Sequence, residues 1–190
     1  MDLKSLDFTL SWYHNYKMLL TLKENFNTFL TYGNEDLSFT ILQGYTTDGG
    51  TIPKILWSFL SPYENYFYSC LLHDYLCFML KNMTEQEREG FSVYKIRSVI
   101  DKCLLYSMRQ HRVKLLTRYL IYYGVRIYSF FTYNFITLKF FKKDIFTIAE
   151  WNAGFLTEDT TMPTIKKVNK NNTINTILSI LKNKNKNNKR

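Results

Sequence analysis

Residues 37–60 read LSFTILQGYTTDGGTIPKILWSFL, and the spacing of the apolar residues changes within this stretch. Leu37, Phe39 and Ile41 alternate with polar residues, which is the pattern of a strand with one buried face. Next comes Thr47-Asp48-Gly49-Gly50-Thr51-Ile52-Pro53, whose glycines allow a tight turn. After the proline, which fits the first turn of a helix, the apolar residues recur at helical spacing. The stretch therefore predicts strands before this turn and helices after it.

The sequence on either side continues these two patterns. Upstream, Met18–Lys23 and Thr28–Tyr32 are short strand-like runs, and Gly33-Asn34-Glu35-Asp36 is a strong turn signal. Downstream, amphipathic spacing predicts helices over residues 63–80, 92–110 and 112–131. We therefore expect an α+β domain, in which a small N-terminal antiparallel β-meander of two to four strands packs on three to four helices.

The basic charge of the chain is concentrated at its C-terminal end. The whole sequence has a formal net charge of +9, but residues 164–190 contain eight Lys and Arg residues and no acidic residue, which leaves 17 basic against 16 acidic residues in residues 1–163. We expect a single domain over 1–163 and a disordered, Asn/Lys-rich tail over 164–190. Weak binding of nucleic acid or of an anionic surface through this tail is the alternative to a merely solvated end. Ile174, Ile177, Leu178 and Leu181 are the one exception, since they could dock as a short helix.

Cysteine usage indicates a reducing compartment, and hydropathy argues against a membrane span. Cys70, Cys77 and Cys103 lie among Leu, Phe and Met residues, which is typical of buried free thiols. The strongest membrane candidate is Leu115–Leu138, but arginines interrupt it, and its uncharged part is shorter than the roughly 20 residues that a spanning helix needs. We expect no transmembrane segment and a cytoplasmic location.

Residue types that perform chemistry are concentrated around Asp48 and around His73-Asp74-Tyr75. Carboxylates and an imidazole are the ligands and proton-transfer groups of a hydrolytic centre that uses Zn, Mn or Mg. The candidate catalytic residues are Asp48, His73 and Asp74, and the candidate metal ligands are the same three together with Asp101. His73 and a carboxylate would hold the metal, while the remaining Asp would orient or deprotonate water.

A purely structural interpretation stays open for each of these residues. Asp48 could cap the helix that begins near Pro53. Asp74 or Asp101 could form a buried ion pair with Arg97 or Arg126, and His73 could be a hydrogen-bonded core histidine. The Tyr- and Phe-rich stripe along residues 112–135 is typical of a core or of a surface that binds a partner.

The motifs resemble a phage and prophage family known as a domain of unknown function, number 1353. Its members typically read Gly-Phe-x-Thr-Asp-Gly-Ala-Ser-Ile-Pro, then an aromatic-rich helix, His-Asp-x-Leu-Tyr, an Arg with an Ala-Asp a few residues on, a Met, and a closing Tyr-x-x-Val-Arg. The corresponding residues here are Tyr45 to Pro53, Leu72-His73-Asp74-Tyr75-Leu76, Arg97 with Asp101, Met108, and Tyr122-Tyr123-Gly124-Val125-Arg126. Gly50-Thr51 replaces Ala-Ser, and Ile100 replaces the Ala before the Asp. The resemblance covers roughly residues 18–130 and implies a phage or prophage setting, but it assigns no reaction.

The sequence supports three functional hypotheses. The first is a phage- or prophage-encoded, metal-dependent hydrolase with an Asp and His-Asp site and an unidentified substrate. The second is a non-enzymatic phage assembly or host-interaction protein, in which the same motifs hold the fold together. The third is a nucleic-acid-binding protein that acts through its basic tail.

Overall fold

The computed structural model describes residues 8–13, 17–47, 65–134 and 167–187. Five strands are followed by helices, which confirms the α+β class. In chain order the described elements are β1 Phe8–Tyr13, β2 Lys17–Leu22, β3 Phe26–Tyr32, β4 Glu35–Ile41, β5 Thr46–Thr47, α1 Phe67–Lys81, α2 Val93–Gln110, α3 Leu115–Asn134 and α5 Lys167–Asn187. The short helix expected directly after Pro53 lies outside the described residues.

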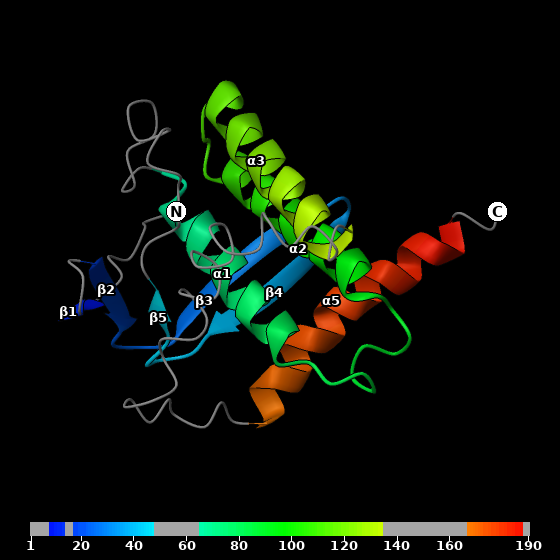
Figure 1. Cartoon of the computed structure of the whole chain (residues 1–190), viewed down its shortest axis with the longest axis horizontal. Helices are drawn as coiled ribbons and strands as arrows, with labels where there is room; N and C mark the ends of the chain where they lie inside the picture. The colour runs from blue at the N-terminus through cyan, green and yellow to red at the C-terminus, as the bar shows by residue number, and fades with distance from the viewer. Residues whose placement is uncertain (1–7, 14–16, 48–64, 135–166, 188–190) are drawn as a thin grey trace.

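The strands form two sheets rather than one continuous meander. β3 and β4 make an antiparallel hairpin from the Phe26–Ile41 pair to the Tyr32–Glu35 pair. Gly33 has φ +65° at its turn, a conformation that glycine adopts without strain. β2 pairs with β1 on one side and with β5 on the other. In the sequence, the β3–β4 hairpin lies between β2 and β5, which are neighbours in the sheet. Figure 1 shows this three-stranded sheet lying to one side of the helices.

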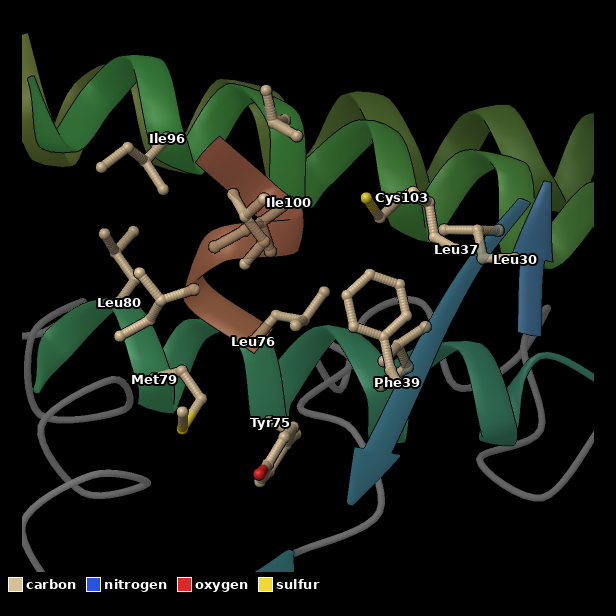
Figure 2. Packing of buried hydrophobic residues seen from close by; sticks show 14 of the residues in the cluster. Leu30, Leu37, Phe39, Tyr75, Leu76, Met79, Leu80, Ile96, Ile100 and Cys103 are labelled. Atoms are coloured by element: carbon tan, nitrogen blue, oxygen red, sulfur yellow. The ribbon is translucent and has the colours of Figure 1, made fainter. Parts of the chain in front are cut away.

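One core joins the hairpin to the helices. Leu37, Phe39 and Ile41 are buried along β4, as their alternation predicts. Figure 2 shows Phe39 close to Leu76 on α1 and below Cys103 on α2. Ile96 and Ile100 continue the buried side of α2, and Leu76, Met79 and Leu80 that of α1. Helical spacing of apolar residues therefore positions α1 and α2 against the same hairpin.

The structure corrects the expectation of a disordered tail for residues 167–187, which form α5. Ile174, Ile177, Leu178 and Leu181 recur at helical spacing, and all of them are buried in the core cluster with α1, α2 and the hairpin. The Lys182 ammonium also lies 2.6 Å from a carboxylate oxygen of Glu89, in the loop before α2. A single apolar stripe therefore holds a helix that is otherwise rich in Lys and Asn. Helix α5 therefore packs as part of the described fold. The boundary at residue 163 and binding through residues 164–190 stay predictions.

Helix α3 packs beside α2 at the edge of the molecule (Figure 1). Its inner side contributes Ile121, Tyr122 and Val125 to a second small core with Leu104 and Met108 of α2. Its outer side carries large apolar residues that are exposed. Neither α3 nor any other helix in the described ranges is long and apolar enough to cross a membrane.

Candidate functional site

The site begins where β5 reaches the middle of α1. Thr47 is the last residue of β5, and its hydroxyl donates to a carboxylate oxygen of Asp74 over 3.4 Å. The contact brings Thr47, the first residue of the turn motif, next to the His-Asp motif. Asp48 follows Thr47 directly in the sequence but lies outside the described residues.

His73 is held from the other side by Asp101 of α2. The Nε2 atom of His73 lies 3.0 Å from Oδ1 of Asp101, and both side chains are buried. Because an ionised carboxylate only accepts hydrogen bonds, Nε2 is the donor. The other ring nitrogen, Nδ1, lies 3.6 Å from Oδ1 of Asp74, whose side chain is 32% exposed. His73 therefore lies between a fully buried carboxylate and a partly exposed one.

Asp101 is the centre of a buried network that connects three helices. Its Oδ1 also accepts from Nε of Arg97 at 2.8 Å, and its Oδ2 accepts from Nη1 of Arg126 at 3.0 Å. The hydroxyl of Ser129 donates to Oδ2 at 3.1 Å. Each carboxylate oxygen thus accepts two hydrogen bonds, which is what a buried charge requires to remain ionised.

Both arginines of the network are positioned by a second contact. The Nη1 of Arg97 lies 2.6 Å from Sγ of Cys77. The Nη2 of Arg126 donates to the Tyr94 hydroxyl at 2.9 Å, and its guanidinium also lies over the Tyr94 ring. These contacts tie α3 and the start of α2 to the carboxylate, so the orientation of Asp101 is fixed from several directions.

The network shifts the pKa values of its members in opposite directions. Burial by itself would lower the pKa of His73, but the Cys77 sulfur and then the two neighbouring carboxylates raise it well above its ordinary value. Burial by itself would raise the pKa of Asp101, but the His73 hydrogen bond and the Arg97 guanidinium lower it. Both directions favour an ionic His73–Asp101 pair.

The predicted site residues divide into two groups, three that the structure brings together and one that it does not describe. His73, Asp74 and Asp101 are brought together, and the structural interpretation of Asp101 as an ion-pair partner of Arg97 and Arg126 is confirmed. His73 is buried and hydrogen-bonded, as the core-histidine alternative also expected. The position of Asp48 is not described, so its predicted role stays a prediction.

Sequence reasoning missed three contributors, namely Cys77, Tyr94 and Ser129. Cys77 lies one helical turn after His73, so the spacing of four residues could have placed it beside the imidazole; its Sγ lies 3.8 Å from Nδ1 of His73. Tyr94 and Ser129 carry no comparable local signal, because their contacts depend on how α2 and α3 pack.

Metal binding requires a further ligand beyond these residues. The described part of the chain contains no group of three His, Cys, Asp or Glu side chains arranged to hold a metal ion. Both oxygens of Asp101 are already occupied by arginine, histidine and serine donors. A metal here would therefore use His73 and Asp74, with at least one ligand from residues that the structure does not describe.

Fold and site together define an α+β domain with a buried His–Asp–Arg network at the junction of β5, α1, α2 and α3. The family described as "Protein of unknown function (DUF1353)" matches residues 22–125, which is more than half of the chain, and the chain belongs to that family. This confirms the family that the motifs resemble. No curated protein and no solved structure matches the chain significantly.

Proposed function

We propose that the chain is a metal-dependent hydrolase whose centre lies where the turn after β5 meets α1. His73 and Asp74 are the proposed ligands from α1, and Asp48 is the proposed ligand from the turn. Zn, Mn and Mg remain the candidate ions, and the substrate class is open among phosphoesters, nucleotides and cell-wall peptides. The host cytoplasm and a phage or prophage setting belong to the same proposal.

The observation that carries the proposal is the spacing of two donor atoms. Nδ1 of His73 and Oδ1 of Asp74 are 3.6 Å apart, which is too long for a good hydrogen bond. Two ligands that each lie about 2.1 Å from one ion at a tetrahedral angle are separated by roughly 3.4 Å. The pair therefore has the separation that a shared ion requires, and a bound ion would displace the Nδ1 proton of the charged imidazole.

The role of Asp101 in this proposal differs from the metal ligand that the sequence suggested. Asp101 accepts from Nε2 of His73, and a metal-binding histidine commonly gives its second ring N–H to a carboxylate. That hydrogen bond fixes the ring orientation and directs Nδ1 toward Asp74. Asp101 is therefore proposed as the residue that positions the ligand, with Arg97 and Arg126 balancing its charge.

Asp74 is the residue with the freedom to act on a substrate. Its side chain is partly exposed, and in the described part of the chain its carboxylate oxygens contact His73 and Thr47. A bound divalent ion supplies an activated water molecule in such sites. The carboxylate oxygen of Asp74 or Asp48 that does not hold the ion would orient that water and accept its proton.

Metal analysis and metal titration of the purified full-length chain test the proposal. We expect one Zn, Mn or Mg per chain by elemental analysis, or one-to-one uptake of one of these ions in calorimetry after chelation. Asp74→Asn and Asp48→Asn should each weaken uptake at least tenfold with little change in melting temperature. Asp36→Asn, at an exposed position near the start of β4, is the matched control and should bind as the wild type does.

Hydrolysis should follow the same variants. The metal-loaded chain is assayed against bis-p-nitrophenyl phosphate, a nucleotide mixture and peptidoglycan fragments, and activity should disappear in Asp74→Asn and on chelation. A wild-type chain that takes up none of the three ions would refute the proposal. An Asp74→Asn variant that retains full affinity would refute the assignment of ligands.

A second candidate is the non-enzymatic assembly or host-interaction protein. The observation that favours it is the exposed apolar outer side of α3, because monomeric proteins rarely leave such a surface uncovered. In this case the Asp101 network acts as a structural clamp. Absence of metal uptake together with a large loss of stability in His73→Ala would favour this function over the hydrolase.

A further inference from the structure

The outer side of α3 is apolar from its first residue. Exposed fractions range from 38% for Tyr119 to 72% for Leu116. Six of these exposed residues make up what we call the outer face of α3, namely Leu115, Leu116, Tyr119, Leu120, Tyr123 and Ile127. Phe130 and Phe131 are also about half exposed and continue the same stripe. The inner side of α3 is occupied by α2, so the helix is apolar on both sides, and such a helix is normally buried on both sides.

The outer face is nearly symmetric about Tyr123. Tyr119 and Ile127 lie four residues before and four residues after it. Leu115 and Leu116 precede Tyr123 by the same intervals at which Phe131 and Phe130 follow it. If α3 is rotated by a twofold axis through Tyr123, each of these apolar residues falls on another apolar residue, whereas Leu120 falls on Arg126. A two-fold interface has this self-complementary form, in which one residue contacts a second and the second contacts the first.

A glycine lies beside the centre of this symmetry. Gly124 is exposed in the middle of α3, and a Cβ added to it would meet no atom within 4 Å. Nothing in the described part of the chain therefore requires a glycine there, although a glycine inside a helix is unfavourable relative to alanine. Successive residues of a helix point about 100° apart, so Gly124 lies at the flank of a crossing centred on Tyr123.

The area of the face fits a dimer of modest size. Large apolar side chains can each bury roughly 150–250 Å². At the exposed fractions of the six residues, the face offers on the order of 600 Å² per copy, and the two phenylalanines add about 200 Å². Two copies would bury at most about 1,200–1,600 Å² in total if the whole face were covered, which reaches the lower part of the range of a specific, stable interface.

Charge favours an antiparallel arrangement of the two copies. Arg112, Lys114 and Arg118 lie at or before the first turn of α3, and the helix contains no acidic residue. A twofold axis through Tyr123 places these basic groups at opposite ends of the paired helices, so they do not repel each other. The antiparallel helix dipoles are also favourably aligned. We propose that the outer face of α3 is a homodimer interface, in which two copies of α3 cross in antiparallel orientation at Tyr123.

Sedimentation of the full-length chain over a range of concentrations tests the proposal. We expect a reversible monomer–dimer equilibrium for the wild type. Tyr123→Glu should raise the dimer Kd at least a hundredfold, since it places two carboxylates on the axis. Lys95→Glu, at an exposed position on α2, is the matched control and should dimerise as the wild type does. Circular dichroism melts establish that both variants are folded.

Cross-linking locates the axis. Tyr123→Cys should give a disulfide-linked dimer on mild oxidation, because a residue on the axis faces its own copy. Lys95→Cys should not do so. The parent chain, with its three cysteines, is oxidised in parallel as the background.

Gly124→Ala is a control for the helix itself. Alanine should raise the melting temperature, because it is the better helix former. It should leave the dimer Kd close to the wild-type value, because position 124 lies at the flank of the crossing and Tyr123 sets the spacing of the two helices. A wild-type chain that stays monomeric at 100 μM would overturn the proposal, whether the face is then covered by anionic vesicles, by another protein or by residues 135–166. A dimer that Tyr123→Glu leaves intact would overturn it as well.

Discussion

In helices α3 and α5, the share of apolar residues in the sequence does not match the share that is buried. The sequence of α5 is dominated by Lys and Asn, yet Ile174, Ile177, Leu178 and Leu181 are buried in the core. The sequence of α3 is strongly apolar, yet a complete side of it is exposed. Burial therefore depends on whether a stripe finds a partner surface within the chain and does not follow from the number of apolar residues. The stripe of α5 has such a partner, whereas the outer face of α3 has none in the described residues.

The inner side of α3 sharpens this comparison. Arg126 and Ser129 extend from it to Asp101, so the helix is fixed to the core through a polar network. Helix α5 is fixed almost entirely by apolar contacts. The two helices thus depend on different interactions, and substitutions can separate them.

Removal of α5 should have the largest effect. A chain that ends at residue 163 loses five buried apolar side chains from the core, each contributing about 1.5–3 kcal/mol. The total is on the order of the 5–15 kcal/mol that stabilises a typical domain, so we expect an insoluble chain or a loss of the cooperative melt. A chain that ends at residue 187 is the control and should melt as the full chain does. A truncated chain with an unchanged melt would restore the predicted boundary at residue 163.

Asp101→Asn should have the next largest effect, because it leaves the buried Arg97 and Arg126 guanidinium groups without their anion. Removing one partner of a buried ion pair typically lowers the free energy of unfolding by about 3–5 kcal/mol. Urea unfolding followed by circular dichroism measures the loss. Asp36→Asn, at an exposed position near the start of β4, is the control, and equal unfolding midpoints for the two variants would show that the network does not support the fold.

The same substitution on the two helices makes the comparison direct. Ile177→Ala creates a cavity in the core, and buried Ile→Ala changes cost about 2–5 kcal/mol. Ile127 is 57% exposed, so Ile127→Ala should change the stability of the monomer by less than about 0.5 kcal/mol. Both are measured by urea unfolding at low protein concentration, where any dimer has dissociated. A similar loss in both variants would mean that the outer face of α3 is covered within its own chain.

Breaking the ion pair between Lys182 and Glu89 should have the smallest effect. Both side chains are about half exposed, and exposed ion pairs contribute between roughly 0 and 1 kcal/mol. Lys182→Gln should therefore shift the thermal melt by a few degrees at most, and the shift should shrink at high salt. A loss comparable with that of Ile177→Ala would show that α5 is held by charge rather than by its apolar stripe.

The candidate site could be predicted only in part. The residues His73, Asp74 and Asp101 could be identified because polar groups of these types are conspicuous among apolar neighbours. The sequence could not show that Asp101 is a buried ion-pair partner and Asp74 a partly exposed carboxylate. That difference depends on which carboxylate oxygen accepts from which donor in the folded chain. Cys77 was foreseeable from its spacing to His73, whereas Tyr94 and Ser129 enter through the packing of α2 and α3.

The sequence by itself determined what local chemistry controls. Alternation along β4, the turn at Gly33 and helical spacing in α1, α2 and α3 follow from short-range preferences, and the motifs identified the family. Only the tertiary structure decided the pairing of β2 with β5, the burial of α5 and the saturation of Asp101 by two arginines. The physical reason is that an apolar stripe or a carboxylate specifies the kind of partner it requires, and the fold of the whole chain determines which partner lies within reach.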